Sequence, residues 1–263
     1  MELKAFCACM ESIAPRALAL DFDNVGLLIE PDHTEIKRVL LALDCTTVTA
    51  QEAVDMGADL LITHHPQFFH GVKSIGFSSP VTGAAALLLR HGIGHFAAHT
   101  NLDAAEGGVN DTLADLLNLQ DVVPIPPENI GRAGTLPAPM KLSELAARCN
   151  QLLDGHGGFT GNGDTLISRV AVLGGAGGGD LEYAQEAGAE AYLTGEAKHH
   201  EILESWERKL SLILCGHYET ERVVLKSLRD RLQILAPDVQ YTITLREKAP
   251  LQFSGKEVPY DET

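Results

Sequence analysis

Hydrophobic and polar positions alternate along the chain with two different periods. Compact apolar runs, which are typical of buried strands, occupy residues 37–44, 58–63 and 93–98. Apolar positions three and four apart, which are typical of amphipathic helices, occur in residues 3–13, 46–56, 80–91 and 107–117. A strand, a helix and a strand in succession form the unit of a parallel sheet covered by helices. The first half of the chain therefore predicts an α/β fold.

A proline-rich segment, residues 122–129, interrupts this alternation, and we place a domain boundary near residue 125. The pattern then restarts, with strands expected at 169–173, 191–194, 210–215 and 241–245 and helices at 180–187 and 219–232. We therefore expect two α/β domains, residues 1–125 and 126–263, with mixed sheets flanked by helices. Part of the C-terminal segment can return to the first domain, and the tail from Lys248 is expected to be irregular.

The two halves are similar enough to suggest an internal duplication. A gapless offset of 131 residues aligns residues 39–63 with 170–194, and both segments carry a Gly-Ala-acid sequence before the second strand. Any two strand–helix–strand units look alike, so duplication and coincidence both remain open. In this alignment His64 and His65 correspond to Gly195 and Glu196.

The chain is strongly acidic. Its 263 residues carry 20 basic and 36 acidic side chains, a formal net charge of −16. Such a surface repels phosphate backbones and anionic lipid, which argues against sequence-independent nucleic-acid binding and against membrane binding. A small anionic substrate would need a locally positive centre, such as a bound metal ion.

The remaining composition predicts a cytoplasmic protein. The N-terminal residues lack the basic region and long apolar core of a signal peptide. The longest apolar stretch, residues 81–98, is interrupted by Arg90, His91 and His95 and cannot span a bilayer. The five cysteines form no C-x-x-C pair, and we interpret them as small apolar residues in a reducing compartment.

Three clusters of metal-ligand side chains follow predicted strands or other apolar runs. They contain five candidate ligands: His64, His65, Asp103, His217 and Glu221. Ligands bind at the carboxyl ends of strands in open α/β sheets, so we expect the clusters to meet at one rim. The four-residue spacing of His217 and Glu221 places both on one face of a helix.

Five ligands are too many for an open catalytic site with one ion, whereas two ions about 3.5–4 Å apart with a bridging carboxylate would use them. Imidazole and carboxylate together suit Zn²⁺, Fe²⁺, Mn²⁺ or Ni²⁺. Two alternatives remain open. A histidine at a strand end is often only a hydrogen-bonded surface residue, and a mononuclear site would need only His64, His65 and Asp103.

Five motifs in this order resemble the Nif-three-like family, whose bacterial members are often labelled GTP cyclohydrolase I type 2 homologues. The motifs are Asp23-Asn24-Val25-Gly26-Leu27, Thr63-His64-His65-Pro66, His99-Thr100-Asn101-Leu102-Asp103, Gly107-Gly108-Val109-Asn110-Asp111 and Gly216-His217-Tyr218-Glu219-Thr220-Glu221. The resemblance covers nearly the whole chain. It implies a two-domain α/β fold, a dinuclear metal centre and a toroidal homohexamer, a trimer of dimers. It also implies the same five ligands, with Glu221 as the bridging carboxylate.

Neighbouring residues are candidates for supporting roles. Asp23 and Asn24 are expected to hydrogen-bond a ligand imidazole, and Asn101 to orient ligands or substrate. The predicted catalytic residues, which would transfer protons, are His99, Glu196 and His200. Glu196 belongs to an acid-x-Lys-His-His segment like that of the family, although family members often carry Asp at its position. For His199 and His200, a place on a solvated helix face is an equal alternative.

A glycine-rich turn at residues 174–179 is a weaker candidate for phosphate binding. It lacks the Gly-Lys-Ser/Thr ending of a P-loop, and Asp180 would repel phosphate and more naturally cap the following helix.

The leading functional hypothesis is a dinuclear metal-dependent hydrolase that acts on a nucleotide-like or phosphorylated small molecule. The family label implies opening of the GTP ring, but no guanine-binding motif is recognisable in the sequence. The alternative is a non-catalytic hexameric scaffold that binds metal or regulates partners.

Overall fold

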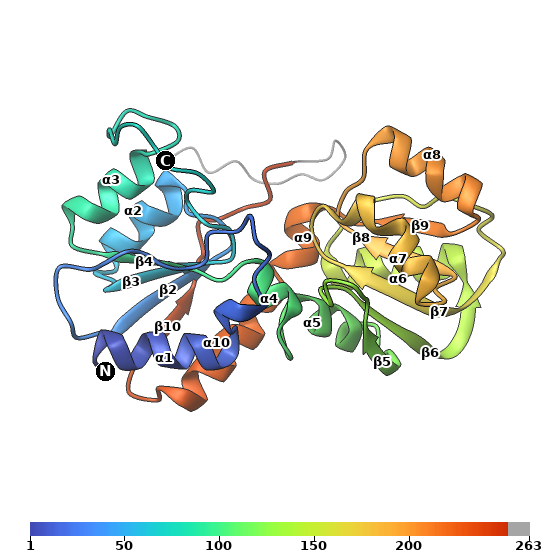
Figure 1. Ribbon diagram of the computed structural model, residues 1–263, viewed down its shortest axis with the longest axis horizontal. Helices are drawn as coiled ribbons and strands as arrows, with labels where there is room; N and C mark the ends of the chain where they lie inside the picture. Colours follow the sequence, from blue (N-terminus) through green and yellow to red (C-terminus); the bar gives the residue numbers. More distant parts are fainter. Residues whose placement is uncertain (252–263) are drawn as a thin grey trace.

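The computed structural model describes residues 1–251; residues 252–263, which hold most of the predicted irregular tail, lie outside the described part. The chain forms two five-stranded mixed sheets, each flanked by helices, at opposite ends of an elongated molecule (Figure 1). The predicted α/β class with two mixed sheets is therefore confirmed.

The first sheet has four parallel strands and one antiparallel edge strand. In spatial order these are β1 (Gly26–Ile29, antiparallel), β4 (Gly94–Ala97), β3 (Leu60–Thr63), β2 (Arg38–Ala42) and β10 (Gln240–Ile243). Alternate residues face opposite sides, so Val39 and Leu41 pack with helices α1 (Leu3–Ile13) and α10 (Val224–Leu235). Leu40 instead packs on the other face with α2 (Thr47–Asp55) and α3 (Gly83–Arg90).

The second sheet repeats this plan with its own edge strands. Its order is β5 (Gln120–Pro124), β6 (Arg132–Lys141), β7 (Leu166–Leu173), β8 (Ala191–Thr194) and β9 (Ser211–Leu214), of which β7 to β9 are parallel. One face is covered by α7 (Leu181–Glu186) and α8 (His199–Arg208). The other is covered by α5 (Val109–Leu116) and α6 (Leu142–Leu153), and this core is continuous with that under the first sheet.

The strand registers of the two halves correspond. Val39 pairs with Leu60 in the first sheet, and Val170 pairs with Ala191 in the second, which is the same pairing at the offset of 131 residues. Internal duplication predicts this agreement, and the duplication itself stays a prediction.

Several predicted elements need correction. The helix expected at 219–232 is two helices, α9 (His217–Glu221) and α10, separated at Arg222 and Val223. The predictions did not include β1, β5, β6 or α4 (Thr100–Ala104), which lack a strong apolar period, and they also missed α6, although its buried positions follow a helical spacing. Strand β5 already belongs to the second sheet from residue 120, and β10 returns to the first. The division into residues 1–125 and 126–263 stays a prediction. No helix in residues 1–251 is long and apolar enough to cross a bilayer.

Candidate metal centre

The parallel strands of both sheets contribute side chains at their carboxyl ends to one cluster between the two halves. His64 and His65 follow β3, and His99 follows β4 at the start of α4. His217 follows β9 at the start of α9, which lies between the two sheets in Figure 1. Candidate ligands from distant parts of the chain therefore lie close together, as the sequence predicted.

Three imidazoles are oriented through their Nδ1 atoms. Nδ1 of His64 lies 2.9 Å from the carbonyl oxygen of Ala98. Nδ1 of His65 lies 2.8 Å from Asp44 Oδ1, and Nδ1 of His217 lies 2.9 Å from Glu196 Oε1. A hydrogen donated from Nδ1 leaves the Nε2 lone pair of each neutral ring free for another partner. This is the usual arrangement of histidines that bind a metal through Nε2.

The Nε2 atoms converge on the carboxylate of Glu221. Glu221 Oε2 lies 3.0 Å from His65 Nε2 and 3.1 Å from His217 Nε2. Its other oxygen, Oε1, lies 3.8 Å from His64 Nε2, which also lies 3.6 Å from Asp103 Oδ1. The two oxygens of one carboxylate thus face different imidazoles, the arrangement that a bridging ligand requires.

Buried polar atoms that have no hydrogen-bond partner indicate whether these residues could hold a cation. His64 Nε2 and Glu221 Oε2 are both buried, and within residues 1–251 neither has a hydrogen-bond partner. An unpaired buried polar atom is costly, and lone pairs that face one another need a positive charge between them. The donor groups His64, His65, His99 and His65, His217, Glu221 each place their ligand atoms within 4.8 Å of one another. The residues therefore fit divalent metal ions.

The backbone opposite Glu221 is shaped to leave room for the cluster. Gly175 has φ +68°, and a Cβ at this position would lie 2.1 Å from Glu221 Oε1 and 3.2 Å from His217 Nε2. Residues with a Cβ rarely adopt this conformation, and here any Cβ would clash with the cluster, so glycine is required.

The pKa values within the cluster reflect burial and close opposite charges. Burial favours neutral His65, but the carboxylates of Asp44 and Glu221 outweigh it and raise the pKa of His65 to about 10. The carboxylate of Glu221 raises the pKa of His217 to about 9 against the effect of burial. Burial raises the pKa of Asp103 to about 7. Burial also opposes ionisation of Glu221, yet the surrounding histidines hold its pKa well below the usual range. The cluster therefore favours positive charge beside Glu221.

His99 is held by a buried carboxylate. Its Nδ1 lies 3.0 Å from Asp23 Oδ1, and the other oxygen of Asp23 accepts hydrogen bonds from the amide and hydroxyl of Thr100. The ring of His99 lies 5.1 Å from that of His64 and 5.4 Å from that of His65, between centroids. His99 is thus oriented beside the cluster by Asp23.

The other predicted residues have different positions. Glu196 contacts the cluster through His217, but His200 has a side chain 73% exposed and contacts Glu201 on α8. His199 is exposed as well. Asn24 donates to the carbonyl of Phe68, and Asn101 binds the backbone of Ala14 and His99, so neither amide contacts a predicted ligand through these bonds.

Sequence reasoning missed one residue of the cluster, Asp44. The signal was available, because Asp44 is an acidic residue directly after the buried strand β2, which is next to β3 in the sheet.

The glycine-rich turn is used for internal contacts. The amides of Gly174, Gly175 and Gly177 donate to Asn110, Thr220 and Thr194, and so are not available to a phosphate. Asp180 stands at the N-cap position of α7, but its side chain makes no capping hydrogen bond.

The chain is similar to known proteins over nearly its whole length. The profile of the family described as Duf34/NIF3 (NGG1p interacting factor 3) matches residues 1–250. A Nostoc protein named GTP cyclohydrolase 1 type 2 homolog is 39% identical over 244 residues, covering 89% of this chain and 92% of its own. A Clostridium perfringens protein of the same name is 31% identical, covering 96% of this chain and all of its own. A crystal structure of a hypothetical protein from Staphylococcus aureus superposes with a TM-score of 0.89 at 27% identity, covering 96% of this chain and 99% of that one.

Proposed function

The chain belongs to the Duf34/NIF3 family, and from this membership and the geometry of the cluster we propose that it is a dinuclear metal-dependent hydrolase. The supporting observation is the split of donors around Glu221. His65 and His217 face one oxygen, and His64 faces the other. We assign His65 and His217 to one ion, His64 and Asp103 to the second, and Glu221 to both.

Two divalent cations held there would supply Lewis-acid chemistry, activating water and polarising the bond to be hydrolysed. The protein contributes orientation and proton transfer. With its Nδ1 hydrogen directed at Asp23, His99 presents Nε2 as the group that takes up or returns a proton. Asp44 and Glu196 keep the Nε2 atoms of His65 and His217 directed at Glu221.

We propose a nucleotide-like or phosphorylated small molecule as the substrate. The ring of Phe69 is 43% exposed and packs edge-on to His99 with centroids 5.5 Å apart. It offers an apolar face for a heteroaromatic ring beside the cluster. An anionic group would be attracted to metal ions, although the rest of the protein is acidic. The name of the relatives, GTP cyclohydrolase 1 type 2 homolog, makes GTP the first compound to test.

The competing function is a metal-binding scaffold without catalysis. One observation favours it: of the three predicted proton-transfer residues, His200 is directed to solvent and Glu196 is engaged with His217. Of these three residues, only His99 is then free to transfer a proton at the cluster.

Metal content and turnover separate these possibilities. We expect metal analysis of protein reconstituted with Zn²⁺ to give two ions per chain, and fewer in Glu221→Gln. The matched control is Glu219→Gln, on the same short helix, because the Glu219 carboxylate packs toward Gly216. One ion per chain that persists in Glu221→Gln would contradict the dinuclear centre.

Reconstituted wild type and His65→Ala are then compared on GTP and on a panel of nucleotides and phosphoesters. Turnover that disappears in His65→Ala supports the hydrolase. A wild type that converts none of the panel supports the scaffold.

The assembly and location are also proposals. Exposed apolar side chains between β3 and α3, including Val72, Ile75 and Phe77, offer a surface for self-association into a homohexamer, a trimer of dimers. Light scattering should then give six times the chain mass of 28.2 kDa. Location in the cytoplasm stays a prediction.

A further inference from the structure

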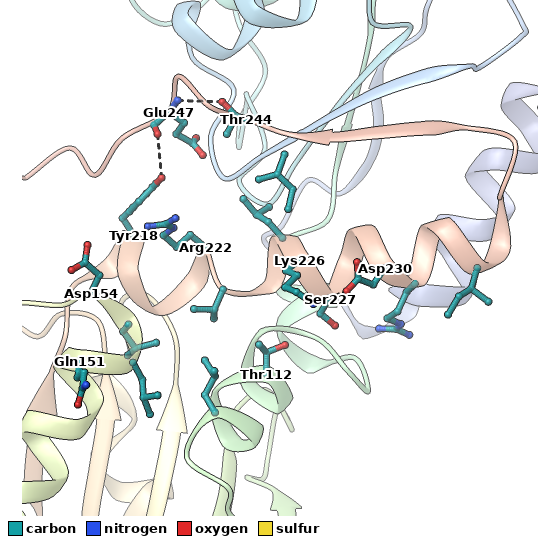
Figure 2. Close-up of a pocket in the computed structure, with 18 residues that line it drawn as sticks. Thr112, Gln151, Asp154, Tyr218, Arg222, Lys226, Ser227, Asp230, Thr244 and Glu247 are labelled. Atoms are coloured by element: carbon teal, nitrogen blue, oxygen red, sulfur yellow. Dashed lines mark hydrogen bonds and ion pairs between the residues drawn. The ribbon is translucent and has the colours of Figure 1, made fainter. Parts of the chain in front are cut away.

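A groove of about 810 Å³ lies between the two halves of the molecule, along α9 and α10 (Figure 2). Helix α9 has two functional faces. His217 and Glu221 point to the metal cluster, whereas Tyr218, together with Arg222 directly after the helix, lines the groove. The groove is therefore a separate space from the cluster, and its volume is in the range of small-molecule sites.

The acidic and basic side chains of the groove differ in whether they have partners of opposite charge. Three carboxylates line it: Asp154, Asp230 and Glu247. Asp230 pairs with Lys226 at 2.8 Å, and Glu247 accepts hydrogen bonds from the amides of Leu43 and Asp44. The guanidinium of Arg222 lies over the Tyr218 ring, 5.4 Å from its centroid. Within residues 1–251 no carboxylate lies within 4.0 Å of this guanidinium.

A second cation that lines the groove, Arg231, also forms no ion pair with the described residues. Arg231 donates to the carbonyl oxygen of Glu106, which neutralises no charge, and the described residues include no carboxylate within 4.0 Å of it. In a protein with a net charge of −16, two guanidinium groups in one groove that have no acidic partner within residues 1–251 are unexpected. They would attract an anion.

The rest of the lining is largely apolar. Leu152 is 40% exposed and Ile234 is 79% exposed, and both line the groove together with Leu116 and Val223. Apolar side chains of this size that remain open to solvent gain free energy when a ligand covers them. The hydroxyls of Thr112 and Ser227, which Figure 2 shows in the groove, donate to the carbonyl oxygens of Gly108 and Gly107, so toward a ligand they can only accept hydrogen bonds.

We propose that this groove is a second ligand-binding site, independent of the metal centre, for a small organic anion with an apolar body. Arg222 holds the anionic group, which can be a phosphate, a carboxylate or a sulfonate. The apolar walls hold the body, and Arg231 attracts a second charge in a longer ligand.

The test uses two fluorescent probes with the same aromatic body and protein stripped of metal with EDTA. The anionic probe is 8-anilino-1-naphthalenesulfonate, and the neutral probe is N-phenyl-1-naphthylamine. We expect the anionic probe to bind one saturable site per chain, at least tenfold more tightly than the neutral probe. Equal binding of the two probes would show a merely apolar surface and would overturn the proposal.

Substitutions locate the site. Arg222→Gln should weaken binding of the anionic probe at least tenfold, to the level of the neutral one. Leu152→Glu, which places a negative charge on the apolar wall, should do the same. Both side chains are exposed, so the variants should fold, and circular dichroism checks this.

The control is Lys73→Gln, an equal change of charge at an exposed lysine that does not line the groove. It should leave binding unchanged. Binding that is unaltered in both Arg222→Gln and Leu152→Glu would place the probe elsewhere and overturn the proposal. Because the protein carries no metal, a failure here leaves the proposed hydrolase untouched.

Discussion

Asp44 Oδ1 lies 2.8 Å from His65 Nδ1, and this contact links the carboxyl ends of two neighbouring parallel strands. The amide of Asp44 in turn donates to Glu247 at 2.7 Å, from the segment that follows β10. Three segments distant in sequence therefore determine the direction of one imidazole. A ring oriented by a carboxylate at Nδ1 is a stronger ligand at Nε2.

Replacing the orienting carboxylate should weaken metal binding. We expect Asp44→Ala to reduce Zn²⁺ affinity by about 10- to 100-fold, the usual effect of removing such a partner. Competition with a fluorescent chelator measures it. Asp164→Ala removes a carboxylate that is 77% exposed and distant in sequence, and should leave the affinity unchanged. Equal affinities for Asp44→Ala and wild type would show that His65 needs no orientation or binds no metal.

A methyl group at Gly175 should disrupt the cluster from the backbone side. Alanine at φ +68° costs about 1–2 kcal/mol of stability, and its Cβ would displace Glu221 Oε1. We therefore expect Gly175→Ala to lose metal binding and to unfold at a lower temperature. Gly179→Ala, in the same turn, is the control because nothing lies within 4 Å of its added Cβ. If both variants bind metal like wild type, Glu221 is not a ligand.

The candidate ligands could be found from sequence because their positions follow a local rule. His64, His65 and His217 each come directly after a short apolar run, and parallel strands end at the same edge. The partners of these histidines depend on tertiary distances that no local pattern encodes. Asp44 contacts His65 from the neighbouring strand, whereas His200 is turned to solvent although it belongs to a recognisable motif.

The helices and strands likewise divide into those with a local sequence signal and those without one. Strands β2, β3 and β4 are buried on both faces and have nearly continuous apolar sequences, which made them recognisable. Strand β5 is exposed along its whole length, so its sequence carries no burial pattern. The break between α9 and α10 also has no sequence signal, because Arg222 and Val223 are both compatible with a helix.

A buried carboxylate on α2 should hold the segment that follows β10. Glu52 accepts hydrogen bonds from the hydroxyl of Thr244 at 2.5 Å and from the amide of Leu245 at 2.9 Å. Glu52→Ala leaves these donors without their partner, and we expect a loss of about 1–3 kcal/mol in the free energy of unfolding by urea. Gln51→Ala, at an exposed position on the same helix, should change it little. Hydrogen exchange at Leu245 should become faster only in Glu52→Ala; unchanged exchange would contradict the role of this carboxylate.

His95 should make the free energy of unfolding depend on pH between pH 6.5 and pH 4. The His95 side chain is fully buried on β4, its Nε2 lies 2.7 Å from Thr63 Oγ1, and burial lowers its pKa from 6.5 to about 4. Between these values the unfolded chain binds a proton at His95 that the folded chain does not. The folded state therefore loses stability as the pH falls through this window, by about 3 kcal/mol in total, and the loss is absent above pH 6.5.

Urea unfolding of metal-free protein from pH 7 to pH 4 measures this effect against His95→Gln. Glutamine keeps a donor for Thr63 but does not titrate, so the metal ligands contribute equally in both proteins. The wild type should lose about 3 kcal/mol more than the variant across the window. Parallel curves would mean that His95 takes up its proton in the folded state at an ordinary pH, and that its burial does not hold it neutral.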